Sequence, residues 1–210
     1  HWAQATGDRT PLYLDETYAR ASRHGGLIPP PCQLYPFSRI SIGYRGGLPG
    51  VHSFFAGSHW RWHEPIRLGE RIAPEVTFKD LVELPSRFAG RMFKQISLIS
   101  FPGSDGHELA QAESWGMRVE RTAAKEKGKY KKVELATPYT KEQLDEIAQL
   151  YAGEKCRGAE PLYFEDVAIG QPLPQIVRGP YTATTAVAFE QGWGGLFIKA
   201  HGFWFDYLRR

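Results

Sequence analysis

The segment Thr6–Ala19, which reads TGDRTPLYLDETYA, contains a carboxylate and a phenol whose spacing could serve acid–base chemistry. Asp8 can accept a proton from a water molecule, and Tyr13 follows closely in the chain. A phenol, with an ordinary pKa of about 10, can donate a hydrogen bond but is a poor base at neutral pH. Because Gly-Asp also suits a plain turn, the structural alternative is a turn carboxylate at Asp8 and a packed tyrosine at Tyr13.

Turn and capping residues predict three short helices that would position this segment. They are residues 2–8 ended by Gly7, residues 16–24 capped by Asp15, and a helix opened by Pro29–Pro31 that runs towards Arg39 and is limited by Pro36. A proline is tolerated in the first turn of a helix, because its missing N–H would have no partner there.

From His52 onwards, apolar and polar residues alternate, which predicts a strand with Trp60 and Trp62 on one face and His59, Arg61 and His63 on the other. Further strand-like runs occupy residues 74–84, 90–101 and 108–121. The pattern predicts a helix followed by a meander of at least four antiparallel strands. His59 and His63 have a spacing that would suit a metal pair on a helix, but on a strand they lie about 13 Å apart, so no metal is expected.

The composition changes at about Thr122, where a lysine-rich stretch predicts an exposed linker. The segment TPYTKEQLDEIAQLYAGEK predicts an amphipathic helix with Thr140 as its N-cap and Gly153 at its end. A strand-like QIVRGPYTAT and a helical TAVAFEQGW follow. We therefore predict an N-terminal domain over residues 1–122, a linker with one helix over 123–158, and an incomplete second unit over 159–210.

The bulk composition narrows the class of protein. With 210 residues, the chain suits one large domain or two small ones. A net charge of +3 is too balanced to favour nucleic acid and is compatible with a small anionic ligand. No apolar run approaches the roughly 18 residues of a membrane span, and no secretory leader opens the sequence. Cys32 and Cys156 lie far apart, which favours incidental thiols in a reducing, cytoplasmic compartment.

Together these features resemble the hot-dog fold, an α+β fold in which an antiparallel sheet wraps around a central helix. More narrowly, the sequence resembles the MaoC-like dehydratases and type 2, R-specific enoyl-CoA hydratases, whose signature runs Ser/Thr-Gly-Asp-x-Asn-Pro-Leu/Ile-His followed by Asp and Ala. The matching residues are Thr6, Gly7, Asp8, Pro11, Leu12, Asp15, Tyr18 and Ala19. The segments HEPIRLGERI and GRMFKQISLISF also look like this family's N-terminal half, and PLYFEDVAIGQPLP resembles the start of the second half in double hot-dog members.

In that family an Asp and a His hold the attacking water, and a backbone N–H at the start of the central helix polarises the thioester carbonyl. This chain departs from the pattern, because Tyr13 replaces the His and Thr10 replaces the Asn. Pro31, which has no N–H, takes the place of a glycine, so Cys32 or Gln33 would have to supply the donor.

In the second half, His201 stands where a catalytic His could be, but Leu196 replaces its Asp. That segment is either a divergent motif or a different structure. The candidate site residues that follow from the resemblance are catalytic Asp8, Tyr13 and His201, and substrate-binding Gly26, Cys32, Gln33 and Trp60.

The resemblance implies reversible hydration of a 2-enoyl thioester, carried by coenzyme A or a carrier protein, with no cofactor. It also implies a homo- or heterodimer formed through hot-dog sheets. A rival hypothesis is a non-catalytic half that binds the acyl chain and supports a partner's active site, which Tyr13 and Pro31 favour. A hot-dog thioesterase would need an acidic residue on the central helix, and PPPCQLYPFSR has none.

Overall fold

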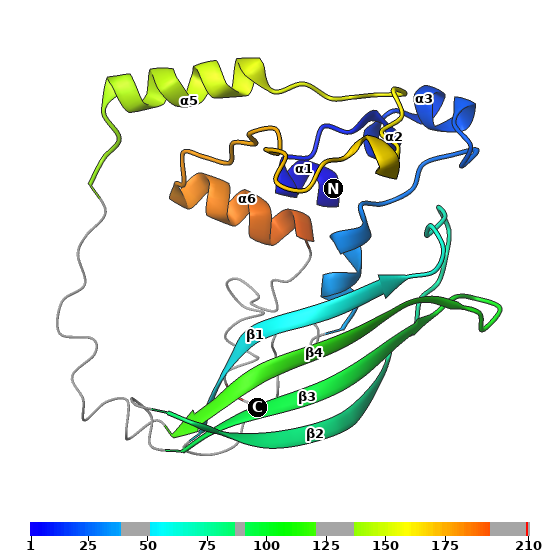
Figure 1. Ribbon diagram of the computed structural model, residues 1–210, viewed down its shortest axis with the longest axis vertical. Coiled ribbons are helices and arrows are strands. Elements are labelled where there is room, and N and C mark those ends of the chain that lie inside the picture. Colours follow the sequence, from blue (N-terminus) through cyan, green and yellow to red (C-terminus); the bar gives the residue numbers. More distant parts are fainter. Residues whose placement is uncertain (39–50, 87–90, 121–136, 194–208, 210) are drawn as a thin grey trace. The chain divides into compact units, whose positions relative to one another are not determined.

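The computed structural model describes residues 1–38, 51–86, 91–120, 137–193 and 209 (Figure 1). The chain divides into two compact units: a helical unit, His1–Gly25 with Ala136–Arg210, and a sheet unit, Gly26–Leu135. The predicted domain boundaries at residues 122 and 158 stay predictions. The predicted lysine-rich linker from Thr122, the helix end near Arg39, and His201 lie outside the described residues.

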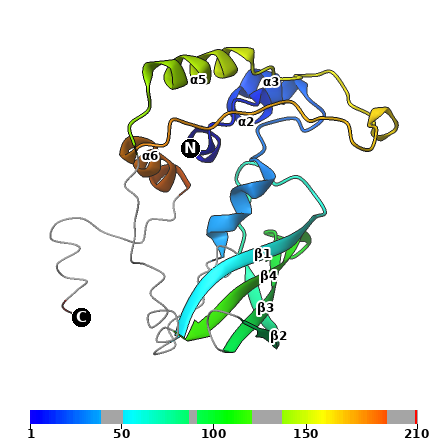
Figure 2. The same cartoon turned by 60° about the vertical axis from the view of Figure 1, so that its left-hand side comes forward.

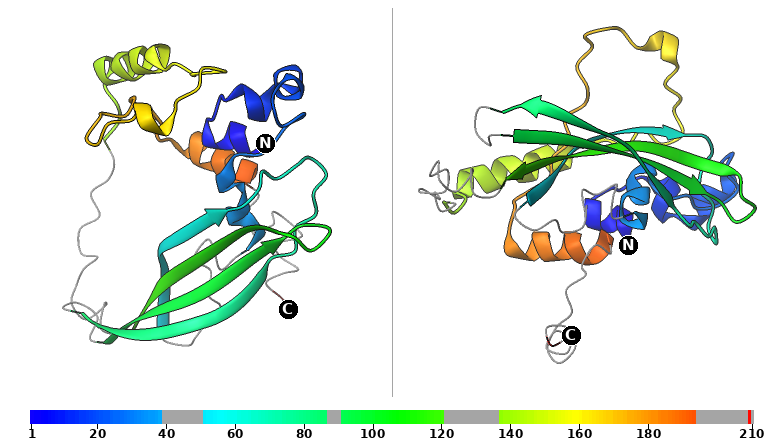
Figure 3. Two further views of the ribbon diagram at one scale, coloured as in Figure 1. Left: turned by 45° about the vertical axis from the view of Figure 1, so that its right-hand side comes forward. Right: turned by 90° about the horizontal axis from the view of Figure 1, so that it is seen from below.

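The sheet unit contains the predicted antiparallel strands. They are β1 Val51–Trp62, β2 Glu75–Pro85, β3 Arg91–Pro102 and β4 Glu108–Glu120. Their order in the sheet is β1-β4-β3-β2, and the sheet is strongly twisted and curved (Figure 3). The predicted meander is therefore right for β2, β3 and β4 but wrong for β1, which pairs with β4. Residues 63–74, which connect β1 to β2, include Pro65 and Pro74 and are too long for a tight hairpin, so the chain crosses to the far edge of the sheet.

The core of the sheet unit lies where η1, a 3₁₀ helix over Pro31–Phe37, meets the sheet. As predicted, Pro31 stands at the start of this helix and Pro36 lies within it. Fully buried Leu34 packs there with a cluster from β3 and β4, which comprises Ile99, Phe101, Ala110 and Ala112. Burying one such leucine contributes about 1.5–3 kcal/mol. We call this face of the sheet the inner face, and η1 runs beside β1 at its edge (Figure 2).

The helical unit contains the predicted helices α1 Trp2–Thr6, α3 Glu16–Ala21, α5 Lys141–Gly153 and α6 Ala183–Trp193. It also contains α2 Pro11–Leu14 and the 3₁₀ helix η2 Phe164–Asp166, which the sequence did not predict. Gly7 ends α1 in the left-handed conformation at φ 68°. The Asp15 side chain caps α3, and Thr140 and Gln143 form a reciprocal capping box at the start of α5.

The predicted strand QIVRGPYTAT is wrong, because residues 171–182 have no regular secondary structure. The backbone N–H of Val177 donates to Glu154 Oε1 at 2.8 Å, and that of Gly179 donates to the Tyr151 hydroxyl at 3.1 Å. These two backbone N–H groups therefore donate to side-chain oxygens and not to the carbonyl groups of a neighbouring strand. Since the described residues after 136 form no strand, the second hot-dog unit also stays a prediction.

Candidate functional site

The carboxylate of Asp8 lies in the turn between α1 and α2. Its Oδ1 accepts a hydrogen bond from the Thr10 N–H at 2.9 Å, and its own N–H donates to the Ala3 carbonyl oxygen at 2.8 Å. Oδ2 makes no hydrogen bond with the residues that the structure describes. Asp8 therefore has the turn role that the sequence offered as an alternative, while one carboxylate oxygen is left to hold a water molecule.

Tyr13 lies within the single turn of α2, half-buried, and its N–H donates to the Thr10 carbonyl oxygen at 3.0 Å. Thr10 thus links both candidate residues, since its N–H donates a hydrogen bond to the Asp8 carboxylate and its carbonyl oxygen accepts one from the Tyr13 N–H. Pro11, at the first helical position, starts α2 without an unsatisfied N–H. The motif therefore folds as one local turn-helix segment.

Three charged residues surround this turn, and sequence reasoning did not identify them as part of the site. The Nε of Arg178 donates to the Thr6 carbonyl oxygen at 3.0 Å. Glu154 forms ion pairs with Arg178 at 3.3 Å and with Arg9 at 3.5 Å. These contacts join segments that lie far apart in sequence, so no local pattern could have indicated them.

The predicted substrate-binding residues belong to the sheet unit. Gly26 lies ahead of η1, where a Cβ would meet no atom within 4 Å. The N–H of Gln33 donates to the Pro30 carbonyl oxygen at 2.9 Å, so the turn already uses one of the two proposed thioester donors. Cys32, the other one, is exposed at the start of η1.

Trp60 lies on the inner face of β1 and packs against the core. Its Nε1 donates to Ser58 Oγ at 2.9 Å and lies 3.2 Å from the Tyr35 hydroxyl. Its ring stacks on Trp62 with centroids 5.6 Å apart and on Phe101 at 5.3 Å. Trp60 thus packs within the sheet unit, Trp62 is 46% exposed, and a substrate-binding role of Trp60 stays a prediction.

A buried arginine on β4 was also not predicted. Arg118 is 7% exposed and belongs to the alternating buried residues of that strand. Its Nε donates to Gln95 Oε1 at 2.9 Å, and burial lowers the pKa of its guanidinium group. The side chain still carries a positive charge at neutral pH, because the ordinary pKa of an arginine side chain lies far above neutral.

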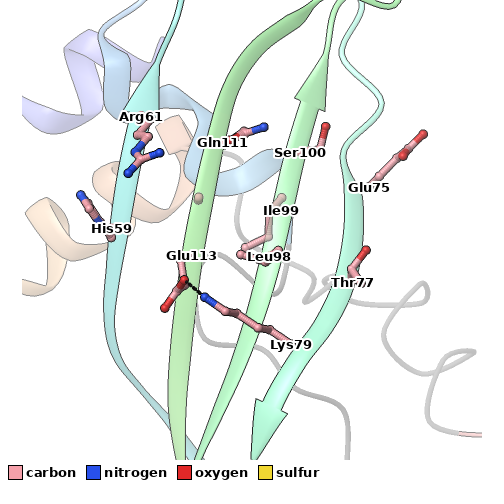
Figure 4. A pocket seen from close by; sticks show the side chains of 11 residues that line it. His59, Arg61, Glu75, Thr77, Lys79, Leu98, Ile99, Ser100, Gln111 and Glu113 are labelled. Carbon is pink, nitrogen blue, oxygen red and sulfur yellow. Dashed lines mark hydrogen bonds and ion pairs between the residues drawn. The ribbon is translucent and has the colours of Figure 1, made fainter.

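The opposite, outer face of the sheet has a hollow of about 500 Å³ that all four strands line (Figure 4). His59 and Arg61 border it from β1, which confirms the predicted alternation with Trp60. In the middle, Lys79 donates to Glu113 at 2.5 Å, and this hydrogen bond lowers the pKa of the Glu113 carboxyl group. The hollow is lined by both polar and apolar side chains, and it lies on the other face from the aromatic residues.

The candidate residues thus fall into separate groups. Asp8 and Tyr13 belong to the helical unit, whereas Gly26, Cys32, Gln33 and Trp60 belong to the sheet unit. His201 lies outside the described residues. None of the described helices has the length and apolar character that crossing a membrane requires.

The chain is similar to known dehydratases and hydratases over part of its length. The model of the FAS1-like dehydratase domain region matches residues 1–92. The alpha subunit of 3-oxo-4,17-pregnadiene-20-carboxyl-CoA hydratase from Mycobacterium tuberculosis is 37% identical over 43 residues, which are 20% of this chain and 14% of that protein. The match therefore spans only a small part of that relative's length.

One solved structure supports the fold. A MaoC-like dehydratase matches with a TM-score of 0.53 and 17% identity over 92% of this chain and 60% of its own. The ChsH1–ChsH2 complex from Mycobacterium tuberculosis matches with a TM-score of 0.46 and 21% identity over 57% of this chain and 74% of its own. The predicted hot-dog fold is confirmed, and residues 1–92 are similar to the dehydratase region of FAS1-like proteins.

Proposed function

We propose that this chain is part of an acyl-thioester hydratase or dehydratase that reversibly adds water to a 2-enoyl-CoA. The observation that carries the proposal is the Thr6-Gly7-Asp8 turn, which lies inside the region that matches the dehydratase family and leaves one Asp8 oxygen open. In the hydration direction, the hydroxyl group of water joins the β-carbon and a proton joins the α-carbon. No metal or redox cofactor takes part in this proposal.

Each candidate residue has a distinct role in the proposed reaction. Asp8 accepts the proton of the attacking water, and Tyr13 orients that water through a hydrogen bond. The backbone N–H of Cys32 or Gln33 is the proposed donor to the thioester oxygen, since Pro31 has none. His201 is kept as a candidate proton donor.

A bulky acyl group is the proposed substrate class. The rings of Trp60 and Trp62 stack at an interplanar angle of 14°, and the exposed face of Trp62 extends this flat apolar surface. Aromatic surfaces of this kind bind flat ring systems well. The relative from Mycobacterium tuberculosis is named for a pregnadiene carboxyl-CoA, which is a bulky ring system and supports this choice.

A non-catalytic role is the second candidate, and two observations favour it. Tyr13 is a poor base where the family has histidine, and Asp8 is already bonded in its turn. In that case the chain would bind the acyl group while a partner supplies the acid–base residues. The exposed thiols of Cys32 and Cys156 support a reducing, cytoplasmic location under either function.

Turnover by the chain alone distinguishes the two candidates. We expect hydration of a bulky 2-enoyl-CoA at a higher kcat/KM than that of a short one, because a bulky apolar group gains more binding free energy from an aromatic surface. The measurement is the loss of ultraviolet absorbance of the conjugated thioester. Tight acyl-CoA binding without any turnover would contradict the catalytic role and support the second candidate.

We also propose that β2 is covered by a second copy of the chain. It is an edge strand, and its exposed apolar side chains include Phe78 at 61% and Leu81 at 50%. Such an edge readily pairs with another strand.

The molar mass in solution tests this interface. We expect the unmodified chain to be a dimer, with a mass twice the 23.7 kDa of one chain, and Phe78→Lys to be a monomer, because a lysine cannot be buried at the paired edge. Light scattering coupled to size-exclusion chromatography gives the mass. The matched control is Phe164→Lys, at an exposed phenylalanine of η2. A monomeric unmodified chain, or a dimeric Phe78→Lys variant, would contradict the proposal.

A further inference from the structure

The turn that carries Asp8 is held from outside its own segment. Arg178 Nε donates to the Thr6 carbonyl oxygen at 3.0 Å, and a Cβ on Gly7 would lie 3.3 Å from the same nitrogen. Gly7 has a φ of 68°, so a larger residue there would be strained as well as crowded. The guanidinium group of Arg178 therefore lies directly against the backbone that precedes Asp8.

Glu154, the residue that follows the last turn of α5, connects Arg178 to the other side of the turn. Its side chain is only 18% exposed. Oε1 accepts hydrogen bonds from Arg178 Nη1 and from the Val177 N–H, while Oε2 faces Arg9 at 3.5 Å. One carboxylate thus links residues on both sides of Asp8 to residues 177–178.

Tyr151, in the last turn of α5, fixes the segment that carries Arg178. Its hydroxyl donates to the Gly179 carbonyl oxygen at 2.9 Å and accepts from the Gly179 N–H at 3.1 Å. The guanidinium group of Arg9 also lies over the Tyr151 ring, 5.8 Å from its centroid. The end of α5 therefore contacts both the Arg178 segment and the Asp8 turn.

We propose that Glu154 and Arg178 are positioning residues that hold the Asp8 turn, residues 6–9, in the conformation in which Asp8 can meet the substrate. The pair acts through the backbone at Thr6 and the side chain of Arg9. Arg178 gives the partly buried Glu154 carboxylate a charge-assisted hydrogen bond, which is stronger than a neutral one, and Arg9 adds an ion pair. The catalytic part of this proposal rests on the proposed hydration function, whereas the structural part does not.

Hydrogen–deuterium exchange of the full chain tests the structural part. We expect Glu154→Gln and Arg178→Lys to exchange about tenfold faster over residues 6–10, because breaking charged hydrogen bonds lets the turn open more often. Peptides from β3 and β4 serve as an internal check that the variants are folded. Glu146→Gln, on the exposed side of α5, is the matched control. Unchanged exchange over residues 6–10 in both variants would overturn the proposal.

A double-mutant cycle on kcat tests the catalytic part. We expect Glu154→Gln to lower kcat about tenfold with little change in KM, and to have no further effect when Asp8→Asn is present, since both changes act through the same carboxylate. Independent, multiplicative effects would overturn the positioning role. If the unmodified chain does not hydrate 2-enoyl-CoA, the proposed function fails, while the exchange result still decides whether the pair holds the turn.

Discussion

Replacing Asp8 by asparagine is expected to lower kcat for hydration of a 2-enoyl-CoA by about 10²- to 10⁴-fold, with little change in KM. Asparagine keeps an Oδ1 that accepts the Thr10 N–H, so the turn survives. What is lost is the group that takes a proton from water. Initial rates against substrate concentration, for the unmodified chain and the variant, separate kcat from KM.

Asp15 supplies the matched control for this substitution. It belongs to the same motif, and its Oδ1 accepts the Tyr18 N–H at 3.0 Å as the N-cap of α3. Asparagine caps a helix as well as aspartate does, so Asp15→Asn should leave kcat unchanged. Equal activity of Asp8→Asn and the unmodified chain would show that Asp8 is only a turn residue.

The variant Tyr13→His gives a second test of the catalytic role of Asp8. The substitution places an imidazole five residues after Asp8, as in the signature that the sequence resembles, and its ordinary pKa of about 6.5 lets it exchange protons at neutral pH. We expect kcat to rise in this variant if Asp8 holds the attacking water. Because Asp8→Asn removes the partner of that imidazole, the gain should disappear in the double variant.

Local sequence signals predicted the helical parts well, because each depends on residues within one or two turns. Gly7 ends α1, Asp15 caps α3, and Thr140 bonds Gln143 at the start of α5, all as the sequence indicates. The alternation in β1 likewise placed Trp60 and His59 on opposite faces. The Asp8 turn is local in the same sense, since its bond to Thr10 joins near neighbours.

Long-range contacts account for what the sequence could not predict. β1 pairs with β4 because the connection after Trp62 leads the chain to the opposite edge of the sheet, where β2 lies, and no local pattern indicates this crossing. Residues 175–184 look like a strand in sequence, but the side chains of Glu154 and Tyr151 accept hydrogen bonds from their backbone N–H groups. Glu154 itself looks like an ordinary residue after a helix end. Its role follows from contacts with Arg9 and Arg178, which no local pattern contains.

The second large effect is expected at Phe101, in the core that supports the aromatic surface. Phe101 is fully buried and stacks on Trp60, which in turn bonds Ser58 and Tyr35. Phe101→Ala should lower the free energy of unfolding by about 3–5 kcal/mol, since it removes apolar contacts and leaves a cavity between η1 and the sheet. Loss of that stack should also loosen Trp60, and with it the proposed acyl-binding surface.

Urea unfolding followed by tryptophan fluorescence measures this effect. A pure loss of stability moves the transition midpoint to lower urea and leaves the slope unchanged. Phe164→Ala is the matched control, because it deletes the same atoms from a side chain that is 89% exposed, and such surface changes usually stay within about 0.5 kcal/mol. A Phe101→Ala midpoint no lower than that of the control would mean that the contact between η1 and the sheet does not stabilise the hot-dog unit. The aromatic surface would then need another support, and the bulky-acyl proposal would lose its structural basis.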